Sequence, residues 1–96
     1  SQVIPLDKLN KLEQLFTLSS QDNSPFSISY VEIKTESFSE INIVTKEGFN
    51  IFCNITDNFI QMINVVKGIK ENKFDKTFSN LEYIDYRYYP KLYIKT

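Results

Sequence analysis

Residues 26–55 constrain the fold more than any other part of the chain, because apolar and polar residues alternate there over three successive segments. Such alternation is typical of strands with one buried face. In the first segment the apolar parity changes after Tyr30, which indicates a β-bulge at that point. Glu47-Gly48 separates the second and third segments, and Gly48 can adopt the positive φ of a hairpin turn. A three-strand meander is expected, whose last strand has an apolar face of Phe49, Ile51, Cys53 and Ile55.

Two segments with helical periodicity flank the meander. The first covers residues 4–20, and its predicted packing face is the stripe formed by Leu6, Leu9, Leu12, Leu15 and Phe16. Pro5 suits its first turn, and the run SSQDNSP ends it. The second covers residues 56–73, where Asp57 or Asn58 can cap the helix. Its predicted apolar side consists of Phe59, Met62, Ile63, Val66 and Ile69.

The last segment, residues 81–95, predicts one or two further strands. Pro90 interrupts the alternation because proline offers no N–H to a ladder, and Leu92 and Ile94 then share one parity. The whole chain of 96 residues suits a single domain. The expected fold class is α+β: an antiparallel sheet, made of the three-strand meander plus the C-terminal strand or strands, with two helices packed on one face.

Composition excludes several kinds of function. The chain has no histidine, which removes the commonest general base and zinc ligand, and its two glycines cannot form a phosphate-binding loop. Cys53 is the only cysteine, so neither an internal disulfide nor a thiolate metal cluster is expected. The net charge of −1 argues against nucleic acid as a partner. No cofactor, no metal and no membrane-spanning run is expected from this sequence.

Tyrosine is concentrated at the C-terminal end, where five of the six tyrosines lie between Tyr83 and Tyr93. Both parities of the run YIDYRYY carry tyrosine, whereas a sheet with one dry face buries only one parity. Some of these rings are therefore expected at the surface, either as part of an interaction surface or as ordinary strand residues. Asp85 and Arg87, the only arginine, share a parity and are expected to form an ion pair that holds the strand.

These residues resemble a known family. The element order, the run EGFNI at the hairpin and the run Tyr83-Ile84-Asp85-Tyr86-Arg87-Tyr88 are similar to the C-terminal β domain of the FtsQ/DivIB bacterial cell-division proteins. The resemblance spans about residues 4–94. It implies a non-enzymatic scaffold domain on the outer side of the cell membrane, belonging to a longer protein with one membrane helix and a POTRA domain. It also implies partners of the FtsB/DivIC and FtsL type and a role in septal peptidoglycan synthesis.

In that family the partner adds a short strand to the last strand of the β domain. An aromatic residue directly after the arginine, here Tyr88, takes part, and the residue two positions further on, here Pro90, lies on the same edge. The chain departs from the family pattern at Tyr86, where an aliphatic residue is usual, and at Pro90, where a small polar residue is usual. The resemblance thus places the partner-binding residues on the strand around 83–89, with pairing expected to end at Pro90. The predicted set is Tyr83, Tyr86, Arg87, Tyr88, Tyr89 and Pro90.

Two other readings stay open at this level. The first is a small ligand-binding α+β domain with a pocket lined by phenylalanine and tyrosine. The second is a hydrolase that uses two acidic side chains, because the separation of carboxylates cannot be read from a sequence. Tyrosines pointing into a deep apolar cavity would favour the first reading, and two acids converging in a cleft would favour the second.

Overall fold

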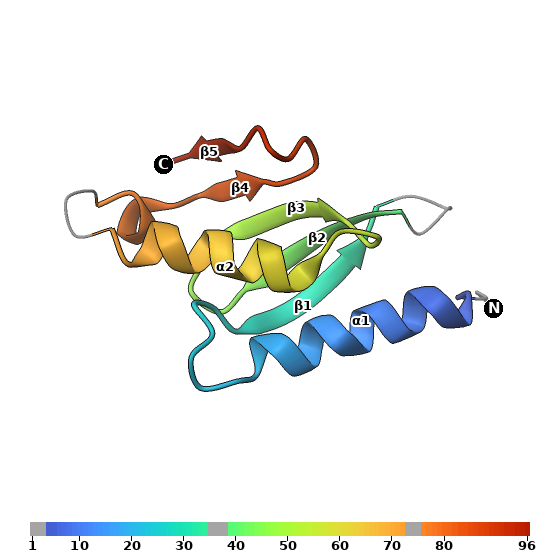
Figure 1. Cartoon of the computed structure of the whole chain (residues 1–96). Coiled ribbons are helices and arrows are strands. Elements are labelled where there is room, and N and C mark those ends of the chain that lie inside the picture. The colour runs from blue at the N-terminus through green and yellow to red at the C-terminus, as the bar shows by residue number, and fades with distance from the viewer. Residues whose placement is uncertain (1–3, 35–38, 73–75) are drawn as a thin grey trace.

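The computed structural model describes residues 4–34, 39–72 and 76–96. In chain order the elements are α1 (Leu6–Ser19), β1 (Ile28–Ile33), β2 (Glu40–Thr45), β3 (Asn50–Asn54), α2 (Phe59–Lys70), the 3₁₀ helix η1 (Phe78–Asn80), β4 (Tyr83–Asp85) and β5 (Tyr93–Lys95). The strands form one sheet with both helices beside it (Figure 1). The predicted α+β class, with a meander between two helices and two closing strands, is confirmed.

The sheet has the strand order β1-β2-β3-β4-β5, so each strand lies beside its neighbour in the chain. All pairs are antiparallel except β3 and β4, which run parallel. The expectation of a purely antiparallel sheet is wrong at this one pair. The reason is α2, which connects β3 to β4 as a crossover helix and so returns the chain in the same direction.

Local signals account for the meander. The register between β1 and β2 shifts between Ile28 and Tyr30, which confirms the predicted bulge. Gly48 has a φ of 104°, and Thr45 closes the hairpin by accepting from the Gly48 N–H and donating its own N–H to the Phe49 carbonyl. The predicted face of the third strand is also confirmed, because Ile51 and Cys53 are fully buried on the helix side.

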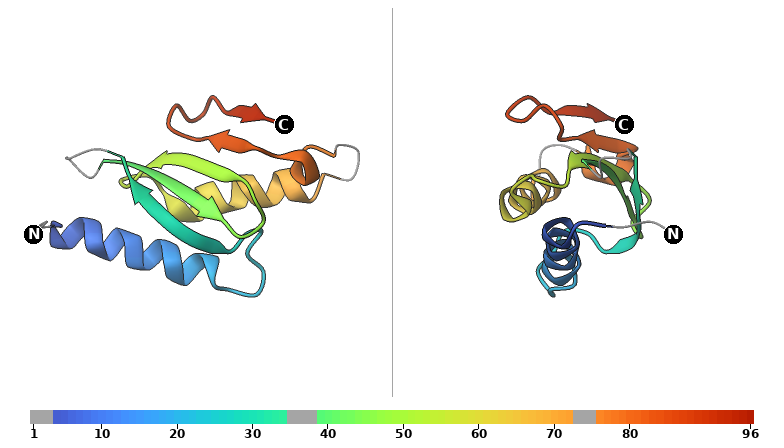
Figure 2. Two further views of the ribbon diagram at one scale, coloured as in Figure 1. Left: turned by 180° about the vertical axis from the view of Figure 1, so that it is seen from behind. Right: turned by 90° about the vertical axis from the view of Figure 1, so that its right-hand side faces the viewer.

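Both helices cover the same face of the sheet, and none of the described segments places a helix on the opposite face (Figure 2). Asn58 caps α2 by accepting a hydrogen bond from the Gln61 N–H at 3.1 Å, as one of the two predicted candidates. Asp57 instead accepts the Asn54 N–H at 2.8 Å and closes the turn before the helix. The core consists of residues from α1, α2, the sheet and the connecting loops: Leu15, Phe26, Ile41, Ile43, Phe49, Ile51, Cys53, Ile55, Phe59, Met62, Val66, Leu81, Ile84 and Tyr86.

The predicted packing stripe of α1 is correct only in part. Leu15 is fully buried and Leu12 packs at the margin of the core, but Leu6, Leu9 and Phe16 are exposed by 71%, 40% and 46%. The helix is rotated so that Leu15 faces the sheet while the Lys11 ammonium reaches α2. Because α1 lies at the β1 end of the helical layer, only part of its apolar surface finds a neighbour (Figure 2).

Candidate partner-binding surface

Strand β4 lies inside the sheet, so the predicted binding strand around residues 83–89 is not an edge strand. Tyr83–Asp85 pairs with β3 on one side and with β5 on the other, and residues 87–90 form a turn. The expectation that this strand forms an open edge is therefore wrong. Pro90 lies in that turn and removes no donor from an edge. Within the described residues, the open C-terminal edge of the sheet belongs to β5.

The outward backbone groups of β5 belong to Ile94. The Asn50 N–H donates to the Glu82 carbonyl and the Tyr86 N–H donates to the Phe52 carbonyl, so alternate residues of this segment face β3. Tyr83 and Asp85 then face β5, where they are paired with Lys95 and Tyr93. Since alternate residues of a strand point to opposite sides, the Ile94 N–H and C=O point away from β4. They offer one donor and one acceptor to an added strand.

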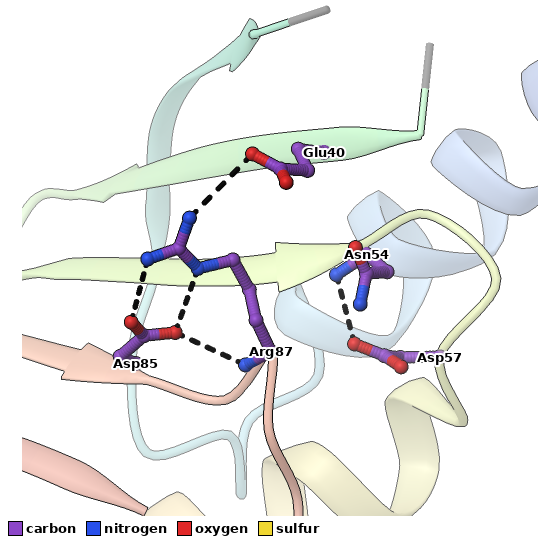
Figure 3. Close-up of polar contacts among 5 residues, drawn as sticks. All are labelled: Glu40, Asn54, Asp57, Asp85 and Arg87. Carbon is purple, nitrogen blue, oxygen red and sulfur yellow. Dashed lines mark hydrogen bonds and ion pairs between the residues drawn. The ribbon is translucent and has the colours of Figure 1, made fainter. Parts of the chain in front are cut away.

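A charged clamp fixes the chain just before the turn between β4 and β5 (Figure 3). The Arg87 guanidinium donates to both carboxylate oxygens of Asp85, from Nε at 2.9 Å and from Nη2 at 2.7 Å, and the Arg87 backbone N–H donates to the same carboxylate at 3.1 Å. A third group, the Glu40 carboxylate on β2, lies 3.5 Å from Nη1. The expected pair of Asp85 and Arg87 is thus present, and it connects the turn to β2 across β3.

The clamp shifts the ionisation of both partners. Hydrogen bonds from the Arg87 side chain hold the pKa of Asp85 below its ordinary value, against the opposing effect of burial. The same hydrogen bonds raise the pKa of Arg87. The Asp85 side chain is 10% exposed, and that of Arg87 is 32% exposed. Both groups therefore stay charged at neutral pH, in a bidentate geometry that fixes their relative orientation.

The predicted tyrosines separate into inward and outward groups. Tyr86 is only 2% exposed, its hydroxyl lies 3.4 Å from Gln61 Oε1, and its ring stacks on that of Tyr89 at 4.8 Å. Tyr83 is half-buried on the open face of the sheet, with its ring 5.4 Å from that of Phe52. Tyr86 is therefore buried away from the surface, whereas Tyr83 keeps part of its ring accessible on the open face.

The outward group surrounds the turn. Tyr88 is 57% exposed, Tyr89 is 42% exposed and Pro90, which follows a cis peptide bond, is exposed. The Tyr88 ring meets that of Tyr93 edge to face at 5.8 Å, and the Arg87 guanidinium lies 5.4 Å from the centre of the Tyr88 ring. Arg87 thus orients Tyr88, and Tyr88 lies next to the first residue of the open strand.

Two residues of this surface were not in the predicted set. Tyr93 is 53% exposed and Ile94 is 40% exposed, and both lie on β5 itself. The shared parity of Leu92 and Ile94 was the signal that a further strand begins after Pro90. That signal could have moved the expected edge from residues 83–89 to β5.

The geometry gives less support to the other two hypotheses, the ligand-binding domain and the hydrolase. Tyr86 points into the packed core rather than into a cavity. A hollow of about 190 Å³ lies on the open face of the sheet, lined by Lys34, Glu40, Ile41, Phe52 and Arg87. Glu40 and Asp85 do converge, but both carboxylates are ion-paired with the same group, the Arg87 guanidinium. In the part of the chain that the structure describes, no group of three or more metal-ligating side chains occurs and no helix is long and apolar enough to cross a membrane.

Comparisons with family models, with curated proteins and with solved structures found no match to this chain. The functional argument therefore depends on the residues and on the geometry of the C-terminal strands.

Proposed function

We propose that this chain is the extracytoplasmic β domain of an FtsQ/DivIB-type cell-division protein and acts as a non-enzymatic scaffold. Its partners are division proteins of the FtsB/DivIC and FtsL type, and binding supports septal peptidoglycan synthesis. The domain works on the outer side of the bacterial cell membrane, anchored through a helix that lies outside this chain. The observation that carries the proposal is the open edge of β5, bordered by exposed tyrosines and fixed by the Asp85–Arg87 clamp.

Binding proceeds by strand addition at β5. An extended partner segment pairs with the outward N–H and C=O of Ile94, and main-chain hydrogen bonds of this kind provide affinity. Tyr88 and Tyr93 lie beside that edge, and their large, rigid aromatic rings offer contact area to the partner. Arg87, Tyr89 and Pro90 position the turn that carries Tyr88. Tyr83 and Tyr86 stabilise the sheet beneath it and have no direct contact with the partner.

Titration with a peptide from the C-terminal region of the cognate FtsB/DivIC protein tests the proposal. We expect backbone amide shifts centred on Ile94 and a dissociation constant that rises at least about tenfold in Ile94→Pro, which removes the outward donor. Tyr88→Ala should weaken binding about fivefold, as expected for the loss of about 1 kcal/mol at an interface aromatic residue. Tyr30→Ala is the matched control, because Tyr30 is similarly exposed (54%) but lies on β1.

Equal binding by the wild type and Tyr88→Ala would show that the site assignment is wrong. An absence of binding by the wild type, with the domain folded, would remove the proposed function itself.

A further inference from the structure

The opposite edge of the sheet carries a second open surface, which the proposed function does not use. Within the described residues β1 pairs only with β2. The Lys34 N–H donates to the Glu40 carbonyl at 2.8 Å, so the backbone groups of Lys34, and of Glu32 two residues before it, face β2. Val31 and Ile33 lie between these positions, and their N–H and C=O groups point outward. Their side chains are half-buried on the helix side.

Helix α1 adds exposed apolar side chains beside this edge. Lys11 and Leu18 mark the side of α1 that faces α2. The Lys11 ammonium lies 4.4 Å from the centre of the Phe59 ring, and Leu18 borders a hollow shared with Ile60 and Ile63. Leu9 and Phe16 each stand two residues before these positions, about 200° around the helix. They therefore lie on the side away from α2.

That side of α1 borders β1. Phe16 lines an open hollow of about 400 Å³ together with Ser27 and Ile28, where β1 begins. Helix and strand run side by side from there (Figures 1 and 2). We call this region the α1–β1 surface: the exposed Leu9 and Phe16 on the helix, and the half-buried Ile28, Val31 and Ile33 on the strand.

An occupant of the α1–β1 surface has to supply two things at once. It needs an extended backbone for the outward groups of Val31 and Ile33, and it needs an apolar surface at helix height for Leu9 and Phe16. A second copy of this chain supplies both. Rotation about a two-fold axis perpendicular to the sheet sets β1 antiparallel to β1, keeps the helices of both copies on one side and brings α1 against α1.

The charges on β1 are compatible with pairing to itself. Tyr30, Glu32 and Lys34 alternate along the open face of the strand. Antiparallel pairing centred on Ile33 sets Glu32 opposite Lys34 of the second copy, and pairing centred on Val31 sets Tyr30 opposite Glu32 of the second copy. Opposite charges across a strand pair are stabilising, whereas two carboxylates face each other only when pairing is centred on Glu32. The net charge of −1 adds little repulsion between copies.

We propose that the α1–β1 surface is the interface of a two-fold symmetric dimer. The strand pair and one helical face form a small interface, below about 1,200 Å², so the dimer is reversible. The sheet becomes continuous across it, and both β5 edges stay open at the two far ends. The dimer is independent of the division partner, because the two surfaces lie on opposite edges of the sheet.

Sedimentation equilibrium of the 96-residue chain over about 10–1,000 μM tests the dimer. We expect the average mass to approach twice the monomer mass at the upper end. Leu9→Glu should raise the concentration needed for dimerisation at least tenfold, and Val31→Pro should do the same by removing an outward N–H. The matched controls are Ile60→Glu, at an exposed apolar position on α2 (53%, against 40% for Leu9), and Ile94→Pro at the other edge. Both should dimerise within about twofold of the wild type.

Circular dichroism shows whether Val31→Pro is folded. If this variant is unfolded, the test of the interface depends on Leu9→Glu, which should fold because Leu9 is exposed. A wild type that stays monomeric to about 1 mM overturns the dimer. A dimer that survives Leu9→Glu, or one that Ile94→Pro abolishes, overturns this surface as its interface. A monomer whose β1 amides shift only when the division-protein peptide is added assigns the surface to a foreign strand and likewise overturns the proposal. Peptide binding at Ile94 is scored separately, so either proposal can fail alone.

Discussion

The two edges of this sheet differ in what surrounds them. The β1 edge is six residues long, carries a bulge and runs beside the apolar side of α1. The β5 edge is three residues long, its outward residue Ile94 is 40% exposed, and it follows the turn in which Arg87 is bonded back to Asp85 of β4. Both edges offer unpaired backbone groups, but only the β1 edge offers them together with a wall of apolar side chains.

This difference bears on what each edge can bind. A surface that combines a strand with a helix fits an occupant that has both, and such an occupant is a second copy. A short strand bordered by tyrosines fits a flexible segment that orders on binding, because most of the contact comes from main-chain pairing and a few rings.

The largest effect is expected from Ile84→Ala. Ile84 is fully buried at the centre of β4, and truncation of such a residue costs about 3 kcal/mol in the free energy of unfolding. Among the described strands, β5 pairs only with β4, so amide exchange should accelerate in β5 before it does in β1. Urea denaturation and native-state hydrogen exchange measure both effects. Ile33→Ala at the half-buried β1 edge is the control and should cost about 1 kcal/mol; equal losses would contradict the comparison.

The next largest effect is expected from Arg87→Ala. Truncation leaves the Asp85 carboxylate nearly buried with only the Arg87 backbone N–H as donor, which should cost about 2 kcal/mol. Arg87→Lys should recover part of the loss, because an ammonium cannot bond both carboxylate oxygens as a guanidinium does.

Glu40→Gln separates the two halves of the clamp. The Glu40 contact is longer, at 3.5 Å, and its side chain is 42% exposed, so the change should cost under about 0.5 kcal/mol. Chemical denaturation gives the ranking. If Glu40→Gln proved as harmful as Arg87→Ala, the clamp would depend on its link to β2 rather than on Asp85.

The sequence predicts the elements whose signals are local. Alternation predicts the meander, the change of parity at Tyr30 predicts the bulge, and Gly48 predicts the hairpin. The pair Asp57-Asn58 predicts the start of α2, where Asn58 is the cap. Each of these features depends on residues within a few positions of one another, so their physics is contained in a short window.

Features that depend on distant neighbours could not be predicted in the same way. Parity shows that some tyrosines are exposed, but only the position of β5 determines that Tyr83 lies inside the sheet. The rotation of α1, which leaves Leu9 and Phe16 outside the core, goes with the contacts of Lys11 to the Asp57 carbonyl and the Phe59 ring, more than forty residues later. Glu40 joins Asp85 and Arg87 across an intervening strand, and no spacing in the sequence indicates that contact.

Acid should weaken the β5 side of the molecule through Asp85. Its pKa is lowered in the folded state by the Arg87 hydrogen bonds, so the ionised carboxylate stabilises the fold above the ordinary value of 3.8, and this contribution is lost as the pH falls through the folded-state pKa. Thermal melting from about pH 2 to pH 6 should show the wild type more stable than Asp85→Asn at the upper end, with the gap closing below about pH 4.

Asp57→Asn is the matched control, and its effect on the pH dependence of stability should have the opposite sign. Burial raises the pKa of Asp57 in the folded state, so ionisation of this carboxylate above 3.8 is unfavourable to the fold. The Asn54 N–H still has an acceptor in the variant, since an asparagine oxygen can replace the carboxylate oxygen. A gap between the wild type and Asp85→Asn that stays constant over this pH range would contradict the assigned role of the clamp.

The smallest effect on stability is expected from Lys95→Val, and it tests what keeps the two edges different. Lys95 is paired with Glu82 at 3.7 Å, and both side chains are about 60% exposed, so the ion pair contributes under about 0.5 kcal/mol. Its larger role is protective, because a lysine on an edge strand opposes pairing with another copy. The melting temperature should stay within about 4 °C of the wild type, while sedimentation should show a new association.

That association has to depend on β5. Adding Ile94→Pro to Lys95→Val should suppress it, and adding Leu9→Glu should not, because the new contact forms at the far edge from α1. A Lys95→Val chain with no new association would mean that the length of β5, rather than its charge, keeps this edge free. If the new association were blocked by Leu9→Glu, it would be the α1–β1 dimer strengthened from a distance, and the two edges would be coupled through the sheet.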